Sequence, residues 1–184
     1  MSENKFDIHE ARNLAAHWAL WLALWWTLSF GSTIVSLHYP FLGLFQWLFA
    51  IWSLMWLTRK LKGYANEVDE CGFMRRLWLS WTTSMYAALL TTMLQYIYFR
   101  FIDQGRTMSA INELMSREDM REALKGLLGG EDWEAQLELM SNITQSQLTA
   151  TMLIMNLTAA FVAAVVATIF SCPDRMKTEQ HRKE

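Results

Sequence analysis

The sequence predicts an all-α integral membrane protein, a four-helix bundle with an extracytoplasmic amphipathic helical hairpin between the third and fourth membrane spans. Of its 184 residues, 53% are hydrophobic and 18% are charged. No Asp, Glu, Lys or Arg occurs within residues 13–58, and charge-free apolar runs of this length are typical of membrane spans. The net charge of −2 argues against a nucleic-acid-binding protein.

We predict a single membrane domain over residues 1–184. A hydrocarbon core of ~30 Å needs roughly 20 helical residues, so the run 13–58 is too long for one span. Pro40 divides it, because Pro suits the first turn of a helix and not its interior. No small-x-small site follows the first apolar run, which we therefore expect to be an uncleaved helix. The predicted spans are about 14–37, 41–57, 77–99 and 148–170, with an outer segment over 102–147 and a tail over 171–184.

The orientation follows from the distribution of the 16 Lys and Arg residues. Basic residues concentrate on the cytoplasmic side of membrane proteins. Here most of them lie in the N-terminal leader, in the loop between spans two and three, and in the tail. We therefore expect both termini to be cytoplasmic and the outer segment to be extracytoplasmic. These basic residues are Lys5, Arg12, Arg59, Lys60, Lys62, Arg75, Arg76, Arg175, Lys177, Arg182 and Lys183.

The outer segment has the pattern of two amphipathic helices. Apolar residues recur at helical spacing over 111–128, Thr107 or Ser109 is placed to cap this helix, and Gly129 ends it. The hairpin either binds a partner or lipid head group, or lies on its own bundle or the membrane surface. We expect Arg100 to orient it, through an ion pair with Asp103 or by reaching lipid phosphate. The candidate interaction residues are Arg100, Asp103, Leu124, Leu128 and Trp133.

Polar residues occur at mid-depth in spans one, three and four. When the spans are aligned by their ends, these residues share one layer, in which the amide of Asn156 is the costliest group to bury in hydrocarbon. The layer either lines a ligand site or forms interhelical hydrogen bonds worth roughly 0.6–2 kcal/mol. Its members are Thr27, Ser29, Thr91, Thr92, Asn156 and Thr158.

Small residues repeat every four positions in the same three spans, and such stripes mark close helix packing. Span two lacks a stripe and is rich in Trp and Phe, so we expect it to flank a core of the other three spans and to face lipid or a partner subunit. The stripes are Ala15, Ala19 and Ala23; Ser80, Ser84 and Ala88; and Ala159, Ala163 and Ala167, with Ala160 and Ala164 beside the last.

We predict no catalytic, cofactor-binding or metal-binding residue. No span carries an acidic or basic residue in its interior, although coupled transporters usually need one. His17 and His38 fall near span ends and are interpreted as interfacial, and the His residues lack metal-ligand spacing. Nucleotide, serine-hydrolase and zinc-protease motifs are also missing from the sequence.

Two stretches carry a family resemblance. Arg59-Lys60-Leu61-Lys62-Gly63-Tyr64 follows span two, and residues 95–103 (QYIYFRFID) close span three. With the Met- and Glu-rich outer segment and the Ala/Val-rich last span, they resemble the bacterial family called domain of unknown function 4199. The resemblance covers most of residues 10–172 and implies a small four-span protein of the Gram-negative inner membrane. It also implies a polyprenyl-phosphate glycosyltransferase as a partner, because such enzymes are often encoded nearby. It brings no catalytic residues.

We therefore expect a non-catalytic accessory or scaffold subunit for another membrane protein, with that glycosyltransferase as the candidate partner and membrane lipids around it. The alternative is a small transporter or lipid-handling protein that uses the mid-membrane polar layer. An integral-membrane enzyme is disfavoured, because no carboxylate, His or Cys pair falls on facing spans. The sequence leaves a homo-oligomer open.

Overall fold

The computed structural model describes residues 8–68, 72–118, 122, 126 and 145–172, and within these residues it contains helices and no strand. All elements are α-helices except η1, a 3-10 turn, and η2, a π-helix. Their order is α1 (Ile8–Ser36), η1 (Pro40–Leu42), α2 (Gly43–Glu67), α3 (Phe73–Ile97), η2 (Tyr98–Ile102), α4 (Arg106–Ser116) and α7 (Gln145–Phe170).

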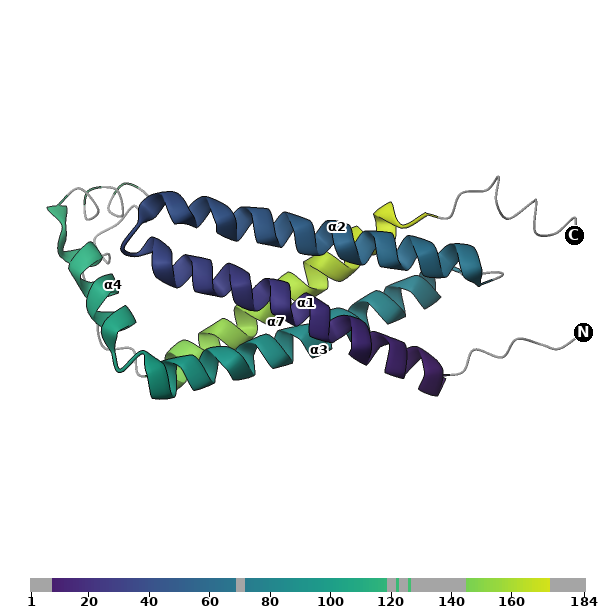
Figure 1. Ribbon diagram of the computed structural model, residues 1–184, viewed down its shortest axis with the longest axis horizontal. Helices are drawn as coiled ribbons and strands as arrows, with labels where there is room; N and C mark the ends of the chain where they lie inside the picture. Colours follow the sequence, from purple (N-terminus) through teal and green to yellow (C-terminus); the bar gives the residue numbers. More distant parts are fainter. Residues whose placement is uncertain (1–7, 69–71, 119–121, 123–125, 127–144, 173–184) are drawn as a thin grey trace, which may run out of the picture.

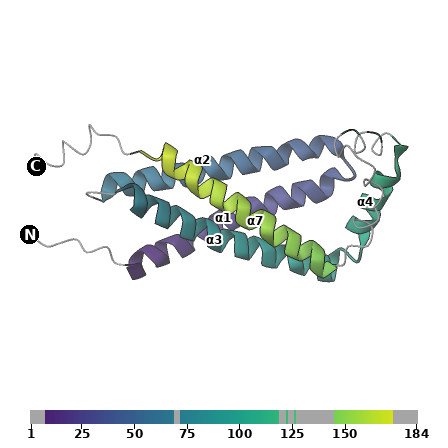
Figure 2. The same cartoon turned by 180° about the vertical axis from the view of Figure 1, so that it is seen from behind.

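The four long helices α1, α2, α3 and α7 lie side by side and reverse direction from one to the next (Figures 1 and 2). Helix α3 packs extensively against both α1 and α7, whereas α2 packs mainly against α1. The end of the molecule where α1 begins and α7 ends carries Arg59, Lys60, Arg75 and Arg76, and we call it the basic end. The opposite end, which α4 crosses, is the distal end.

Within the part of the chain that the structure describes, three helical stretches are long and apolar enough to cross a membrane: His9–Ser36, Pro40–Glu67 and Ser146–Phe170. Helix α3, which contains the predicted third span, is not among them. It has the length, at 25 residues, but hydroxyl and amide side chains lower its hydropathy. The hydroxyl and amide side chains are those of Ser80, Thr82, Thr83, Ser84, Thr91, Thr92 and Gln95. All of them except Thr82 are buried within the molecule.

Helix α2 continues beyond the apolar stretch that predicted it. The chain turns at Pro40, where the sequence predicted a break between two helices. Helix α2 then runs through the basic residues to Glu67. Leu57 and Leu61 are fully buried and Ala65 nearly so, so the last turns of α2 belong to the core at the basic end.

Small residues form the helix contacts, as the stripes in α1 and α3 predicted. Ala15 and Ala19 are fully buried in α1, as are Ser80 and Ser84 in α3. The backbones come close enough for the hydroxyl of Ser80 to donate a hydrogen bond to the carbonyl oxygen of Ala164 in α7, at 3.3 Å.

The stripe predicted for α7 is only partly correct. Ala167 is fully buried, as are Ala160 and Ala164 beside the stripe, whereas Ala159 is exposed and Ala163 is half-buried. Because Ala occupies adjacent positions along this helix, the sequence pattern fits two neighbouring faces equally well. Contacts with α3 select the face that carries Ala160 and Ala164.

Candidate functional site

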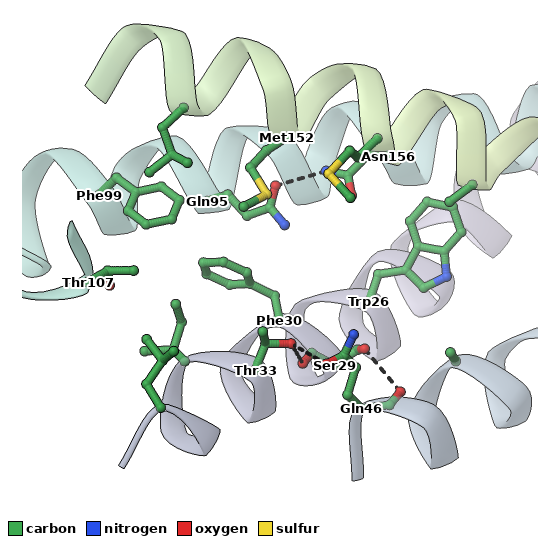
Figure 3. Close-up of a pocket in the computed structure, with 16 residues that line it drawn as sticks. Trp26, Ser29, Phe30, Thr33, Gln46, Gln95, Phe99, Thr107, Met152 and Asn156 are labelled. Atoms are coloured by element: carbon green, nitrogen blue, oxygen red, sulfur yellow. Dashed lines mark hydrogen bonds between the residues drawn. The ribbon is translucent and has the colours of Figure 1, made fainter. Parts of the chain in front are cut away.

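A group of polar side chains lines a cavity toward the distal end, between the α1–α2 pair and the α3–α7 pair (Figure 3). The cavity, which we call the polar pocket, has a volume of about 400 Å³, a size typical of small-ligand sites. Trp26, Phe30, Phe99 and Met152 supply apolar wall. Its polar lining residues are Ser29, Thr33, Gln46, Gln95, Thr107 and Asn156.

On the α3–α7 wall, the Nδ2 atom of Asn156 donates hydrogen bonds to Oγ1 of Thr92 and to Oε1 of Gln95, both at 2.8 Å. Gln95 is only 5% exposed. The hydroxyl of Thr92 in turn donates to the carbonyl oxygen of Ala88 within α3. Asn156 thus uses both amide hydrogens to join the two helices, which satisfies its donor capacity in an apolar setting.

The α1–α2 wall is built in a similar way around Gln46. The hydroxyl of Thr33 donates to Oε1 of Gln46 at 2.9 Å, and the hydroxyl of Ser29 donates to the main-chain oxygen of Gln46 at 3.2 Å. Each wall therefore carries one glutamine whose side-chain oxygen accepts a hydrogen bond from the neighbouring helix.

The side-chain amide nitrogens of Gln46 and Gln95 face the cavity. Figure 3 shows the Nε2 atoms of Gln46 and Gln95 on the cavity side of their walls. Within the described residues, neither nitrogen donates a hydrogen bond. Hydrogen bonds strengthen in a low-dielectric interior, and the described lining contains no cation, so the pocket is suited to a neutral group with acceptor oxygens, such as an ester or a hydroxyl.

An apolar groove of about 650 Å³ between α2 and α7 adjoins the polar pocket. Trp26, Ala50, Met155 and Ala159 line both spaces. The indole nitrogen of Trp26 donates to the hydroxyl of Ser53 at 3.2 Å, which fixes the ring between them. The groove opens at the surface, because several of its lining residues are exposed. These are Trp47, Ile51, Ile154 and Val162.

The structure divides the predicted polar layer. Ser29 and Asn156 line the polar pocket, and Thr92 is bonded to Asn156. Thr91 is buried, and its hydroxyl has no partner within the described residues. The other two hydroxyls bond to their own helices: Thr27 to the carbonyl oxygen of Ala23, and Thr158, beside the apolar groove, to that of Ile154.

Asp103 begins the outer segment. Its carboxylate accepts hydrogen bonds from the backbone N–H of Thr107, at 2.9 Å, and from the Thr107 hydroxyl, in the first turn of α4. Asp103 is 3% exposed, whereas Arg100 is exposed and, among the described residues, forms no ion pair with it. Leu124, Leu128 and Trp133, the other predicted interaction residues, lie outside the described residues.

Helices of membrane-spanning length around a lateral, partly polar cavity define a helical membrane protein as the class to which this chain belongs. The family model described as "Protein of unknown function (DUF4199)" matches residues 14–172, so the chain belongs to that family, as its sequence motifs predicted. No curated protein and no solved structure matches the chain.

Proposed function

We propose that this protein is a non-catalytic, lipid-handling membrane protein that holds one membrane lipid in the cavity formed by the polar pocket and the apolar groove. The observation that carries the proposal is that these two spaces adjoin, with Trp26, Ala50, Met155 and Ala159 lining both. A lipid also has an apolar part and a polar part. Its acyl chain needs an apolar channel, and its ester or head-group oxygens need hydrogen-bond donors. Gln46 and Gln95 supply those donors.

The proposed topology is a four-helix bundle in the bacterial inner membrane, with both termini cytoplasmic and the 102–147 segment forming an extracytoplasmic helical hairpin. Helix α3 crosses as the third span, because the helices around it bury most of its polar side chains. Lys and Arg at the basic end support the orientation. Reporter fusions after Gly63 and Glu184 are expected to read cytoplasmic and a fusion after Gly130 external. A cytoplasmic signal at Gly130 contradicts this topology.

Photocrosslinking tests the lipid proposal. The full chain is reconstituted in nanodiscs with a phosphatidylethanolamine that carries a diazirine at the end of one acyl chain, and the adducts are mapped by mass spectrometry. We expect adducts on groove residues such as Ile154 and Val162.

The variant Ala159→Trp places a large ring where the polar pocket and the apolar groove meet, and it should abolish these adducts. Ala150→Trp is the matched control, since Ala150 is an exposed alanine of the same helix that lines neither space. Equal adduct yields from the two variants contradict the proposal.

A second candidate function is that of an accessory subunit for another membrane protein, with a polyprenyl-phosphate glycosyltransferase as the candidate partner. An exposed aromatic face of α2 favours it, because Phe45 and Trp52, seven residues apart, are 43% and 48% exposed and line neither the polar pocket nor the apolar groove. Trp and Phe are enriched at protein interfaces. Co-purification of an enzyme of this kind from native membranes, lost in the double variant Phe45→Leu/Trp52→Leu, supports this function. Recovery of only a second copy of the chain indicates a homo-oligomer instead.

A further inference from the structure

A third cavity lies at the basic end, far from the polar pocket, where α1 and α2 meet. It has a volume of about 500 Å³ and combines aromatic rings with cations. We call it the basic-aromatic pocket. Its principal lining residues are Trp18, Trp56, Arg59, Lys60, Gly63 and Tyr64.

Aromatic side chains make the floor of this pocket rigid. Trp18 is almost fully buried, and its ring meets that of Tyr64 edge to face, with centroids 6.5 Å apart and planes at 89°. This geometry is favourable for aromatic pairs. Trp and Tyr are also the residues that collect at the level of lipid head groups.

Two cations at this pocket contact aromatic rings. Nζ of Lys60 lies 5.8 Å from the centre of the Trp56 ring, and the guanidinium of Arg75, from α3, lies 5.9 Å from that of Tyr64. Such contacts orient a cation while leaving its charge in place. Within the described residues, neither Arg59 nor Lys60 forms an ion pair. Among the described residues that line the pocket, Glu67 is the one acid.

Gly63 borders open space in the lining of the pocket. A Cβ atom at this position would meet no heavy atom within 4 Å, although the residue lies within α2, where glycine is intrinsically unfavourable. Trp56, Lys60 and Gly63 follow one another at spacings of four and three residues in α2, so they share one face of the helix.

We propose that the basic-aromatic pocket binds the phosphate of an anionic phospholipid at the membrane surface. Phosphate forms strong charge-assisted hydrogen bonds with Arg and Lys, and the aromatic rings would cover the glycerol region of the lipid. An anionic lipid fits better than a zwitterionic one, because the pocket has more cations than acids. The proposal does not depend on the lipid proposed for the polar pocket, which lies at the other end of the helices.

The test titrates the detergent-solubilised full chain with dioleoyl-phosphatidylglycerol and measures bound lipid by native mass spectrometry. Gly63→Leu fills the open space without a clash and should weaken binding at least about tenfold. Gly31→Leu is the matched control, because Gly31 is also helical, also has open space at its Cβ position and lines none of the three cavities. Lys60→Gln should weaken binding and Glu67→Gln should strengthen it, since they change the local charge in opposite directions.

Other outcomes of this titration would overturn the proposal or assign a different ligand to the pocket. Equal binding by Gly63→Leu and Gly31→Leu overturns the proposal. Equally tight binding of dioleoyl-phosphatidylcholine overturns the assignment to an anionic lipid, and complete displacement of the lipid by inorganic phosphate assigns the pocket to a soluble anion. Every titration is made in the Ala159→Trp background, which blocks the cavity at the polar pocket. Lipid bound in that cavity is then not counted, and the two lipid proposals are measured separately.

Discussion

The guanidinium of Arg76 reaches across the basic end and donates a hydrogen bond to the main-chain oxygen of Ser171, at 2.6 Å and over 95 residues of sequence. The same nitrogen lies 3.3 Å from the Ser171 hydroxyl. Ser171 follows the last residue of α7, where unpaired carbonyl groups give the helix a partial negative charge. Arg76 is buried, so this contact joins the start of α3 to the end of α7 away from water.

Arg76→Gln should therefore destabilise the protein by about 1.5–3 kcal/mol, the range for a hydrogen bond to a charged group. Unfolding in mixed detergent, followed by circular dichroism, measures the change. Arg12→Gln, an exposed arginine at the same end, is the control and should have little effect. Equal loss of stability in the two variants would mean that total charge, and not this contact, matters.

Ala164→Leu should be far more disruptive than Ala163→Leu. Ala164 is fully buried beside Ser80, and extra methyl groups in a packed interior cost about 1–3 kcal/mol or more. Ala163 faces the apolar groove, where a leucine side chain has space. Thermal unfolding in detergent distinguishes the two variants, and a more stable Ala164→Leu protein would contradict the packing described for α3 and α7.

Asn156→Leu should reduce stability by about 0.6–1.7 kcal/mol, the range measured for hydrogen bonds between membrane helices. Thr92 and Gln95 lose their shared partner in this variant. Thr158→Val is the matched control on the same helix, because Thr158 bonds only to its own backbone within the described residues. The same unfolding assay applies, and identical midpoints would show that the Asn156 bonds add no stability.

Asp103→Ala should loosen α4, since the variant removes the acceptor for two groups of Thr107. Loss of such a capping carboxylate costs about 0.5–2 kcal/mol locally. Limited proteolysis should show faster cleavage near Ser116, at the end of α4. Arg100→Ala is the comparison. The sequence predicted that Arg100 orients this segment, and faster cleavage in Arg100→Ala alone would favour that interpretation over the contacts of Asp103.

The features of the fold that the sequence predicted correctly are those for which a single kind of residue gave an unambiguous pattern. The helix break at Pro40 and the buried faces of α1 and α3 followed from proline chemistry and from isolated small residues. The end of α2 could not be predicted from charge, because Arg59 and Lys60 mark where the chain meets water and not where the helix stops. The buried face of α7 was ambiguous, because alanines at 159–160 and 163–164 offer two adjacent faces.

The polar pocket was only partly predictable. Asn156, Ser29 and Thr92 were identified because polar residues stand out in apolar spans. Gln46 and Gln95 were not, although an amide within an apolar run is as costly as Asn156 and was the available signal. Their meeting across one cavity depends on the diverging paths of the two helix pairs, and a list of mid-depth residues does not contain that geometry.

The number of residues in the π-helix η2 affects which side chains face α4. The amide of Asp103 bonds to the carbonyl oxygen of Tyr98, five residues back, so this turn holds one residue more than an α-helical turn. Each helical residue rotates the chain by about 100°, and the extra one decides which side chain faces Thr107. A relative with one residue fewer here would present its neighbour instead, even if every other amino acid were identical. When family members are aligned at this junction, an insertion or deletion in η2 therefore changes which side chains correspond in space, even where no amino acid is substituted.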